Sequence, residues 1–268
     1  MSLQRILSER GARGVATVTL NRPDRGNAYD DVMLRELAAQ LAELGADPSV
    51  RVVVLRGAGK HFCAGADIAW HRSNQSADAH PAEPAPKLLD VLLALDALPK
   101  PTICLLHGAA VGGGLAFAAC CDVALAEEGA FFSIPEVRIG LVPGPLVPIF
   151  LRAMDYRAFR RYGLSGERFS GADALRLGLV HEVCAADQIE AALSRIIEAL
   201  LLGAPGAIAA LKSVAARLAS PPITEALLRE LEAGSAGMLQ TDEAREGVAS
   251  FLEKRKPNWY PKREGEKS

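Results

Sequence analysis

Two glycine-rich stretches carry the first sign of chemistry in this sequence. Residues 108–122, GAAVGGGLAFAACCD, contain three consecutive glycines and no acid, base or nucleophile before the final aspartate. Residues 57–67 read GAGKHFCAGAD. Each stretch follows a run typical of a buried strand and precedes an expected helix, a junction at which backbone N–H groups lack partners. One N–H from each stretch would bind a negatively charged oxygen, and glycine allows close approach because it has no Cβ.

The triple glycine also has a purely structural interpretation. Glycines at the start of a helix permit tight packing of the helix on a strand, and GGG matches neither GxGxxG nor the lysine-containing phosphate loop. The occurrence of two similar junctions favours oxygen binding over packing alone. If the oxygen belongs to a thioester carbonyl that becomes an enolate, the two N–H groups form an oxyanion hole.

Glu136 is the candidate acid–base residue, within FFSIPEVRIGLVPG at residues 131–144. Its apolar neighbours would raise the pKa of the carboxyl group toward the range useful for proton transfer. The alternative is structural, because Ser133 and Glu136 form an S-x-x-E capping box, with Pro135 in the first turn and Gly140 as the helix stop. The local sequence alone favours the cap.

Other polar residues give weaker signals. Asp67 suits either a catalytic base or a helix cap, and Trp70 suits a residue that closes a pocket. The sequence contains no GxSxG, HExxH or EF-hand pattern, so it offers no start for a serine hydrolase or a metalloprotease. The histidines near the glycine stretches are isolated, which is typical of structural or solvated side chains; they are His61, His71 and His107.

The composition predicts a soluble, cytoplasmic protein. The chain has 268 residues, of which 50% are hydrophobic, and its formal net charge is −2. This balance does not favour nucleic acid or anionic membrane as a partner, and no apolar run reaches the length of a membrane span. The N-terminus lacks the apolar run of a secretory signal. Five scattered cysteines without CxxC spacing indicate reduced thiols rather than disulfides or a zinc site.

Alternating strands and helices must position these residues. Strands are expected at 14–20, 50–57, 102–108 and 122–127. Asp30 should cap a helix that carries leucines on one face, and a second helix should begin near Leu88. The alternation indicates βαβ units and a largely parallel sheet. Residues 73–86 are expected to form a mobile loop or a lid, and the chain is helical in period after about residue 185.

The motifs together resemble the enoyl-CoA hydratase/isomerase (crotonase) superfamily. The resemblance rests on HFCAGADIAW, HGAAVGGGLAFAACCDVALA and FSIPEVRIGLVPG, and VATVTLNRPDRGNAY, GERFSGADALRLGLV and FLEKRKPNW match in the same order. It covers nearly the whole chain. The residues of these motifs are most similar to those of bacterial hydratases of branched acyl-CoAs, the methylglutaconyl-CoA hydratase-like group.

The resemblance implies an α/β fold, a crotonase-like spiral of ββα units over residues 1–190, followed by a helical trimerisation region over residues 191–268. It implies homotrimers or hexamers. It also implies an acyl-CoA substrate, no metal and no cofactor, since CoA is part of the substrate. The backbone N–H groups of Ala66 and Gly113 would form the oxyanion hole. Further contacts to substrate or CoA would come from Arg22, Arg25, Ala64, Asp67, Ile68 and Gly144, and from Phe251 and Lys254 toward a neighbour's CoA.

One departure from the family pattern bears on the reaction. Two-carboxylate hydratases carry a glutamate two residues after the triple glycine, where this chain has Ala116. A single Glu136 is the pattern of Δ3,Δ2-enoyl-CoA isomerases, and it also occurs among sequences grouped with branched-chain hydratases. The sequence therefore predicts hydration of a 2-enoyl-CoA by Glu136, with isomerisation as the alternative. Decarboxylation, thioester hydrolysis and a non-catalytic acyl-CoA- or RNA-binding role are more distant alternatives.

Overall fold

The computed structural model describes residues 4–73, 86–218 and 241–261. Most of the loop or lid expected at 73–86 therefore lies outside the described residues. The same holds for residues 219–240, which include the start of the third helical stretch that the C-terminal sequence predicts.

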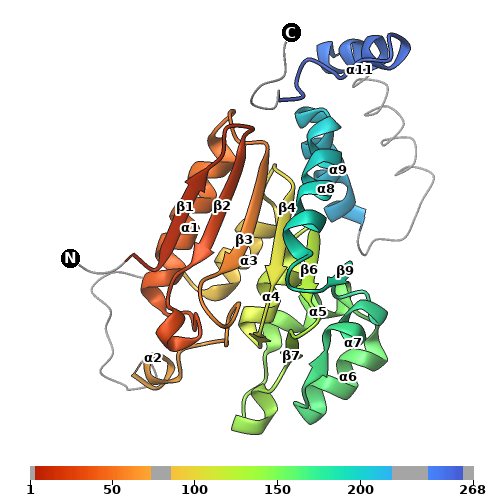
Figure 1. Cartoon of the computed structure of the whole chain (residues 1–268). Helices are drawn as coiled ribbons and strands as arrows, with labels where there is room; N and C mark the ends of the chain where they lie inside the picture. Colours follow the sequence, from red (N-terminus) through yellow and green to blue (C-terminus); the bar gives the residue numbers. More distant parts are fainter. Residues whose placement is uncertain (1–3, 74–85, 219–240, 262–268) are drawn as a thin grey trace.

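A six-stranded sheet forms the centre of the molecule (Figure 1). Its outermost pair is an antiparallel hairpin, and every other neighbouring pair is parallel. The four strands expected from the sequence are all present in this sheet. In spatial order the strands are β1 (Ile6–Arg10), β2 (Val15–Leu20), β3 (Val52–Gly57), β4 (Thr102–Leu106), β6 (Val123–Glu127) and β9 (Glu182–Cys184).

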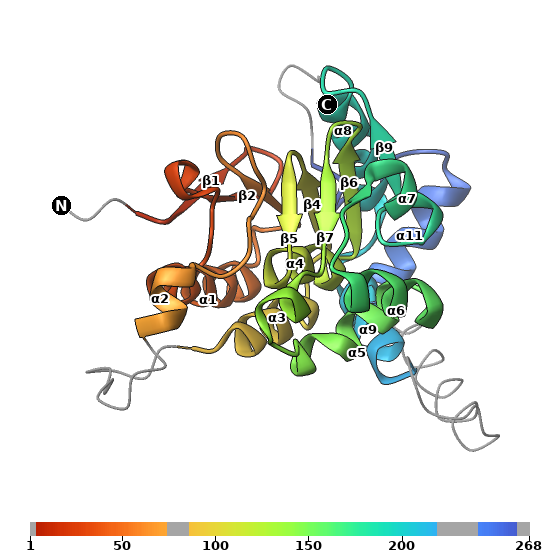
Figure 2. The same ribbon diagram turned by 90° about the horizontal axis from the view of Figure 1, so that it is seen from below.

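A smaller sheet stands beside the first and holds the strands that lead to the glycine and glutamate motifs (Figure 2). Gly108 joins β4 to this sheet with φ +55°, and a Cβ there would lie 2.6 Å from Nδ1 of His61, so the tight turn requires glycine. The passage from β4 through the small sheet into a helix is one ββα unit, as the resemblance implies. The sheet consists of β5 (Ala109–Val111), β7 (Phe131–Ser133) and β8 (Phe169–Ser170).

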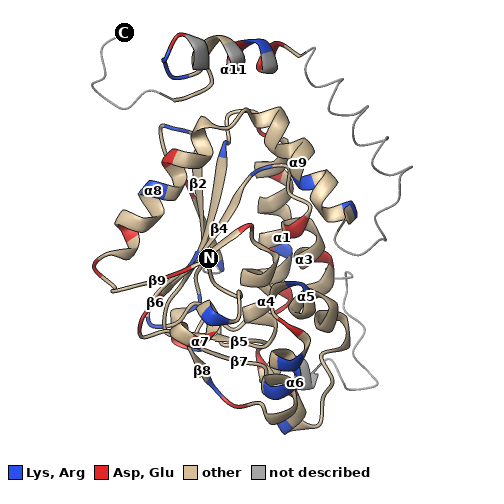
Figure 3. Cartoon of the chain, turned by 90° about the vertical axis from the view of Figure 1, so that its right-hand side faces the viewer, with Lys and Arg blue, Asp and Glu red and all other residues tan. Residues whose placement is uncertain are grey.

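Helices cover both faces of the large sheet (Figure 3). Successive strand residues point to opposite faces, so Val53 and Leu55 join the core beneath α1, α3 and α4, whereas Val52 and Val54 pack with α8. The helices are α1 (Asp31–Ala46), α2 (Ile68–Ser73), α3 (Leu88–Asp96), α4 (Gly113–Cys120), α5 (Val147–Ala153), α6 (Tyr156–Ser165), α7 (Gly171–Arg176), α8 (Ile189–Leu202), α9 (Pro205–Leu218) and α11 (Asp242–Leu252), with 3₁₀ turns η1 (Pro23–Arg25), η2 (Glu136–Ile139) and η3 (Gly144–Leu146).

The expected cap of α1 is confirmed. The Asp30 carboxylate accepts a hydrogen bond from the backbone N–H of Met33 at 2.9 Å, which satisfies one of the free donors of the first turn. The helix then buries Leu34, Leu37 and Leu41 on one face, as their spacing predicts.

The helical character of the chain after residue 185 is also confirmed for the described residues. The division proposed at 190/191 falls within α8, whose Ile189 and Leu193 are buried against the sheet. No single helix in the described ranges is long and apolar enough to cross a membrane. The pair α8 and α9 reaches that length only when taken together, across a bend of 100°.

Candidate active site

The register of the small sheet brings the two glycine stretches and Glu136 to one edge. Cys63 pairs in parallel with Ala110, and Ala110 pairs in parallel with Phe132. Three parallel segments therefore run side by side, and their carboxyl ends meet at the same edge. Ala66 lies three residues beyond Cys63, Gly113 lies three residues beyond Ala110, and Glu136 lies four residues beyond Phe132. Residues separated by up to 70 positions are thus brought to one site.

Ala66 and Gly113 each present a backbone N–H at this edge. In the described part of the chain, neither N–H donates to another protein group. Gly113 is the first residue of α4, so the partial positive charge of the helix N-terminus adds to its N–H. Both donors therefore lie at the edge where the sequence places an oxyanion site, and their binding of a negatively charged oxygen stays a prediction.

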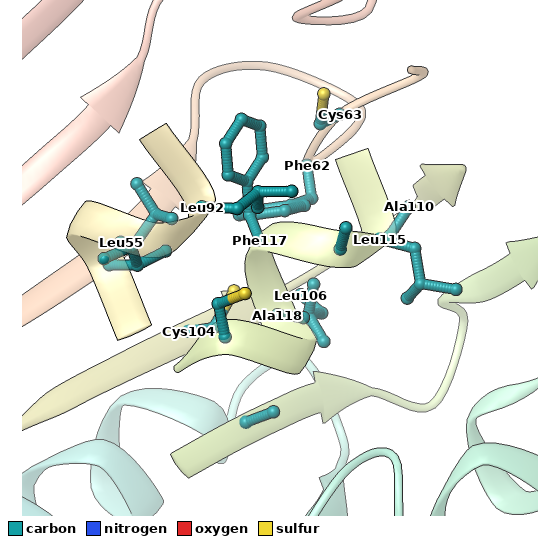
Figure 4. Close-up of a cluster of buried hydrophobic side chains, with 14 of the residues drawn as sticks. Leu55, Phe62, Cys63, Leu92, Cys104, Leu106, Ala110, Leu115, Phe117 and Ala118 are labelled. Atoms are coloured by element: carbon teal, nitrogen blue, oxygen red, sulfur yellow. The ribbon is translucent and has the colours of Figure 1, made fainter. Parts of the chain in front are cut away.

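The triple glycine serves both packing and the site. A Cβ on Gly114 would lie 2.6 Å from Sγ and 2.7 Å from the carbonyl oxygen of Cys63, so this glycine allows α4 to pack on the other glycine stretch. Figure 4 shows the buried side chains beneath that contact, including Cys63, Leu115 and Phe117. A Cβ on Gly112, in contrast, would collide with the carboxylate of Glu136. Packing of α4 on Cys63 therefore requires Gly114, whereas the close approach of Glu136 requires Gly112.

Glu136 lies against Gly112 as the first residue of η2. The backbone N–H of Gly112 donates to the carbonyl of Ser133 at 2.9 Å, which extends the pairing of β5 with β7 and fixes this approach. Burial raises the pKa of the Glu136 carboxyl above its ordinary value, as the sequence predicts. Its Oε2 is buried and has no hydrogen-bond partner among the described residues.

The capping box predicted for Ser133 and Glu136 is wrong. The residue before η2 is Pro135, and no side chain caps this turn. Ser133 instead ends strand β7, and its hydroxyl donates to the carbonyl of Gly166 at 3.0 Å. Because the turn begins at Glu136 itself and the Ser133 hydroxyl bonds to Gly166, Glu136 is free of the structural role that the local pattern favours. Gly140 does end the turn, with φ +74°.

Asp67 is a helix cap rather than a base. Its Oδ1 accepts from the backbone N–H groups of Ala69 at 3.0 Å and Trp70 at 3.4 Å. Its Oδ2 accepts from Arg22 at 2.8 Å. These hydrogen bonds, that from Arg22 foremost, lower the pKa of Asp67, which makes it a weak proton acceptor.

The residues predicted to contact substrate or CoA fall into two groups. Arg22 is largely buried and donates to the carbonyl of Ala28 as well as to Asp67, so it holds the loop before α1 to the Ala66 loop. Four others are exposed, namely Arg25, Ala64, Ile68 and Gly144. Their contacts with CoA stay predictions.

The last two predicted residues lie far from this edge. Lys254 is exposed just after α11, which Figure 1 shows at the opposite end of the molecule from α2. Phe251 lies in α11, and its side chain is outside the described residues. A single copy therefore does not bring Lys254 to the site, and its contact with a neighbour's CoA stays a prediction.

The histidines of the glycine stretches have structural partners. Nδ1 of His61 accepts from the backbone N–H of Ala109 at 3.1 Å, and Nε2 of His107 lies 3.0 Å from the carbonyl oxygen of Gly59. Where the chain is described, no group of three or more His, Cys, Asp or Glu residues is arranged to hold a metal ion.

Sequence reasoning missed Tyr29 and Asn27. Tyr29 contacts both glycine stretches, because its backbone pairs with Ala66 and its side chain reaches Gly113. Asn27 is fully buried, and its amide donates to the carbonyls of Ala58 at 2.8 Å and His61 at 2.7 Å. Both lie in NRPDRGNAY, which the sequence presents only as turn chemistry followed by a helix cap. Asn27 has φ +56°. Its place directly after the turn from Pro23 to Gly26 was the one sequence signal for this conformation.

Known proteins share the sequence pattern and the fold of this chain. Residues 10–262 match the family model described as enoyl-CoA hydratase/isomerase. A mouse protein named enoyl-CoA hydratase domain-containing protein 2, mitochondrial, is 33% identical over 93% of this chain and 86% of its own length. A crystal structure of an enoyl-CoA hydratase from Shewanella pealeana has a TM-score of 0.88 at 36% identity, covering 96% of this chain and 97% of that one.

A crystal structure of an enoyl-CoA hydratase/isomerase from Marinobacter aquaeolei has a TM-score of 0.89 at 30% identity, covering 96% of this chain and 100% of that one. The fold of the described residues, with a mostly parallel sheet, a small second sheet and covering helices, is therefore the crotonase fold. The comparisons do not separate the methylglutaconyl-CoA-like group from its relatives. The chain belongs to the enoyl-CoA hydratase/isomerase family.

Proposed function

We propose that this chain is an enoyl-CoA hydratase, which adds water across the C2=C3 double bond of a 2-enoyl-CoA, branched acyl groups included. The observation that carries the proposal is the convergence of Ala66, Gly113 and Glu136 on one edge of the small sheet. Two N–H donors that have no protein acceptor among the described residues lie beside one carboxylate. This arrangement suits a reaction in which negative charge develops on an oxygen while a proton is transferred nearby.

In this mechanism the thioester oxygen accepts hydrogen bonds from the N–H groups of Ala66 and Gly113. The carbonyl polarises, and C3 becomes electrophilic. The oxygen of a water molecule bonds to C3 while Glu136 takes one of its protons, and the electron pair of the C2=C3 bond moves to form the enolate. Glu136 then returns the proton to C2 as the enolate reverts to the carbonyl. The product has gained one water, and the enzyme is unchanged.

The environment of Glu136 suits this double role. A carboxylate with an ordinary pKa is a weak base and a poor match for a proton that must be taken and then returned. Burial raises the pKa of Glu136, and the unpartnered Oε2 leaves one carboxylate oxygen without a competing donor among the described residues. The acyl-CoA substrate and water supply everything else, so the proposal requires no metal or redox cofactor.

Isomerisation of a 3-enoyl-CoA is the second candidate, and Ala116 favours it. In the two-carboxylate pattern this position supplies the second acid, but here the side chain is a fully buried methyl group. One carboxylate is enough to remove a proton from C2 and deliver it to C4, with the enolate held by the same two donors. Hydration by one carboxylate requires Glu136 to orient the water molecule as well as to transfer the proton.

The test offers the purified protein crotonyl-CoA, 3-methylglutaconyl-CoA and a 3-enoyl-CoA, and follows water addition and double-bond migration separately. We expect water addition, and we expect Glu136→Gln to slow it about 10²- to 10⁴-fold, the usual contribution of an acid–base residue. Glu9→Gln is the matched control, because Glu9 is exposed on β1. Turnover of only the 3-enoyl substrate would assign the chain to isomerisation, and an unaffected Glu136→Gln variant would refute the mechanism.

We also propose a cytoplasmic homotrimer or hexamer, in which Phe251 and Lys254 of one copy approach the CoA bound to the next. Support comes from the distance of α11 from the site within one chain (Figure 1). Light scattering after size exclusion should give three or six copies, and Lys254→Ala should raise KM for the CoA substrate with little change in kcat. A monomer that turns over substrate normally would refute this assembly.

A further inference from the structure

Tyr29 links the two proposed oxyanion donors. Its backbone N–H donates to the carbonyl of Gly65 at 2.9 Å, and its own carbonyl accepts from Asp67 at 2.9 Å, so its backbone brackets Ala66. Its side chain reaches the other donor. A Cβ on Gly113 would lie 2.9 Å from Cε1 of Tyr29 and would collide with the Tyr29 hydroxyl. The hydroxyl therefore lies directly against the residue whose N–H is proposed to bind the substrate oxygen.

The ring of Tyr29 is held by its neighbours, whereas its hydroxyl is not. The ring makes edge contacts with Trp70, at 6.4 Å between ring centroids, and with Phe117, at 6.2 Å. Only 7% of the residue is exposed. Among the described residues the hydroxyl makes no hydrogen bond, and unlike Oε2 of Glu136 it is not fully enclosed, so water reaches it. The hydroxyl therefore contributes nothing evident to the fold and is available to a ligand.

Electrostatics make this hydroxyl a donor. Burial is the main cause that raises the pKa of Tyr29, and the nearby Cys63 and Glu136 raise it further. A phenol with a raised pKa stays protonated throughout the neutral range, so it cannot serve as a base. It can donate a hydrogen bond to an oxygen that gains negative charge.

We propose that the Tyr29 hydroxyl is a third hydrogen-bond donor to the thioester oxygen bound by Ala66 and Gly113. The proposal rests on the proposed function only in that a thioester occupies this edge. It holds for hydration and for isomerisation alike, because both pass through the same enolate. Tyr29 would then strengthen charge stabilisation in a site that has a single carboxylate.

The test substitutes Tyr29→Phe, which removes the hydroxyl and keeps the ring contacts with Trp70 and Phe117. Tyr156→Phe is the control, because Tyr156 is exposed on α6. The probe is 4-(dimethylamino)cinnamoyl-CoA, a 2-enoyl-CoA whose absorption moves to longer wavelength when its carbonyl is polarised. We expect a smaller red shift in Tyr29→Phe than in the wild type and in the control.

Kinetics provide the second measurement. For crotonyl-CoA we expect kcat of Tyr29→Phe to fall about 10- to 100-fold, less than for loss of a main oxyanion donor, with KM nearly unchanged. The melting temperature should be equal to or above that of the wild type, because the hydroxyl makes no hydrogen bond to any described residue. A lower melting temperature would mean that the hydroxyl serves the fold, which would overturn the proposal.

Other outcomes separate this proposal from the proposed function. An undiminished red shift in Tyr29→Phe would overturn the proposal, even if kcat fell, because the hydroxyl would then act on the water or elsewhere. A loss confined to substrates with a polar acyl group would also overturn it, since the hydroxyl would then bind the acyl chain. If the wild type shows the red shift but adds no water, hydration fails while the Tyr29 measurement stands. No red shift in the wild type would refute both.

Discussion

Gly112→Ala tests the position of Glu136 by adding an atom beside its carboxylate rather than by removing the carboxylate. Gly112 has φ +52° and ψ −126°, a backbone conformation that is open essentially only to glycine. An added Cβ would also collide with one carboxylate oxygen of Glu136 and lie 3.2 Å from its carboxyl carbon. The substitution therefore combines backbone strain with displacement of the proposed acid–base residue.

Both costs have an expected size. The strain should lower the free energy of unfolding by about 1–3 kcal/mol, measured by urea denaturation. A carboxylate displaced by about 1 Å should lower kcat/KM for crotonyl-CoA by roughly 10²-fold. The two effects are measured on the same preparation, so loss of activity can be separated from loss of folded protein.

Gly129→Ala is the matched control. Gly129 lies outside the positive-φ region, and a Cβ there would meet nothing within 4 Å. We expect its free energy of unfolding to change by less than about 0.5 kcal/mol and its activity to stay at the wild-type level. If Gly112→Ala were as stable and as active as Gly129→Ala, the close approach of Glu136 to the glycine turn would be wrong.

Three further predictions concern the surroundings of the site. Asn27→Ala should lower the free energy of unfolding, measured in urea, by about 3 kcal/mol or more, because the carbonyls of Ala58 and His61 lose the buried amide that donates to them. An unchanged denaturation midpoint would contradict this. Burial raises the pKa of Cys63 to about 12, so mass spectrometry should find it unmodified by an aromatic disulfide at pH 8 until urea is added, whereas early modification would refute its burial. Glu136→Gln should raise the melting temperature at pH 8, because burial makes the charged carboxylate destabilising at any pH above its raised pKa. The gain should vanish below pH 4.5, where the carboxyl is protonated in the folded and the unfolded chain. A gain independent of pH would show that the charge of Glu136 is not its cause.

The local elements could be predicted because their signals are local. Periodic leucines and the Asp30 cap predict α1, and β-branched runs bounded by glycine predict β3 and β4. These patterns reflect burial of one helix face or of both faces of a strand, and a window of about ten residues is long enough to display them.

The site was predictable only where a motif marks it. Ala66, Gly113 and Glu136 stand out through glycine junctions and through the family resemblance. Their convergence depends on the register of Cys63 with Ala110 and of Ala110 with Phe132, which short strands do not reveal. Register is set by the alternation of buried and exposed residues and by turn geometry, and strands of three residues such as β5 and β7 show too little of that alternation.

The errors have the same cause. Ser133 and Glu136 match a capping box by spacing, but pairing with β5 keeps Ser133 within β7, and the 3₁₀ turn begins only at Glu136. Ser133 is therefore not the N-cap of that turn, and the box does not form. Tyr29 gives no signal as a site residue, because an aromatic beside a turn is usually a core residue. Its contact with both donors becomes visible only in the folded chain, where Tyr29 lies between Ala66 and Gly113.

The pH dependence of kcat/KM for hydration of crotonyl-CoA tests the central claim most directly. This quantity reports the pKa of the acid–base residue in the free enzyme. We predict that kcat/KM falls as the pH decreases through an apparent pKa above 4.5, the ordinary value for glutamate, because Glu136 must be ionised to accept a proton from water. The Glu136→Gln variant should lack this limb and retain only a residual rate. A wild-type profile that is flat across this range, or a Glu136→Gln variant with the full rate, would contradict the assignment of Glu136 as the acid–base residue.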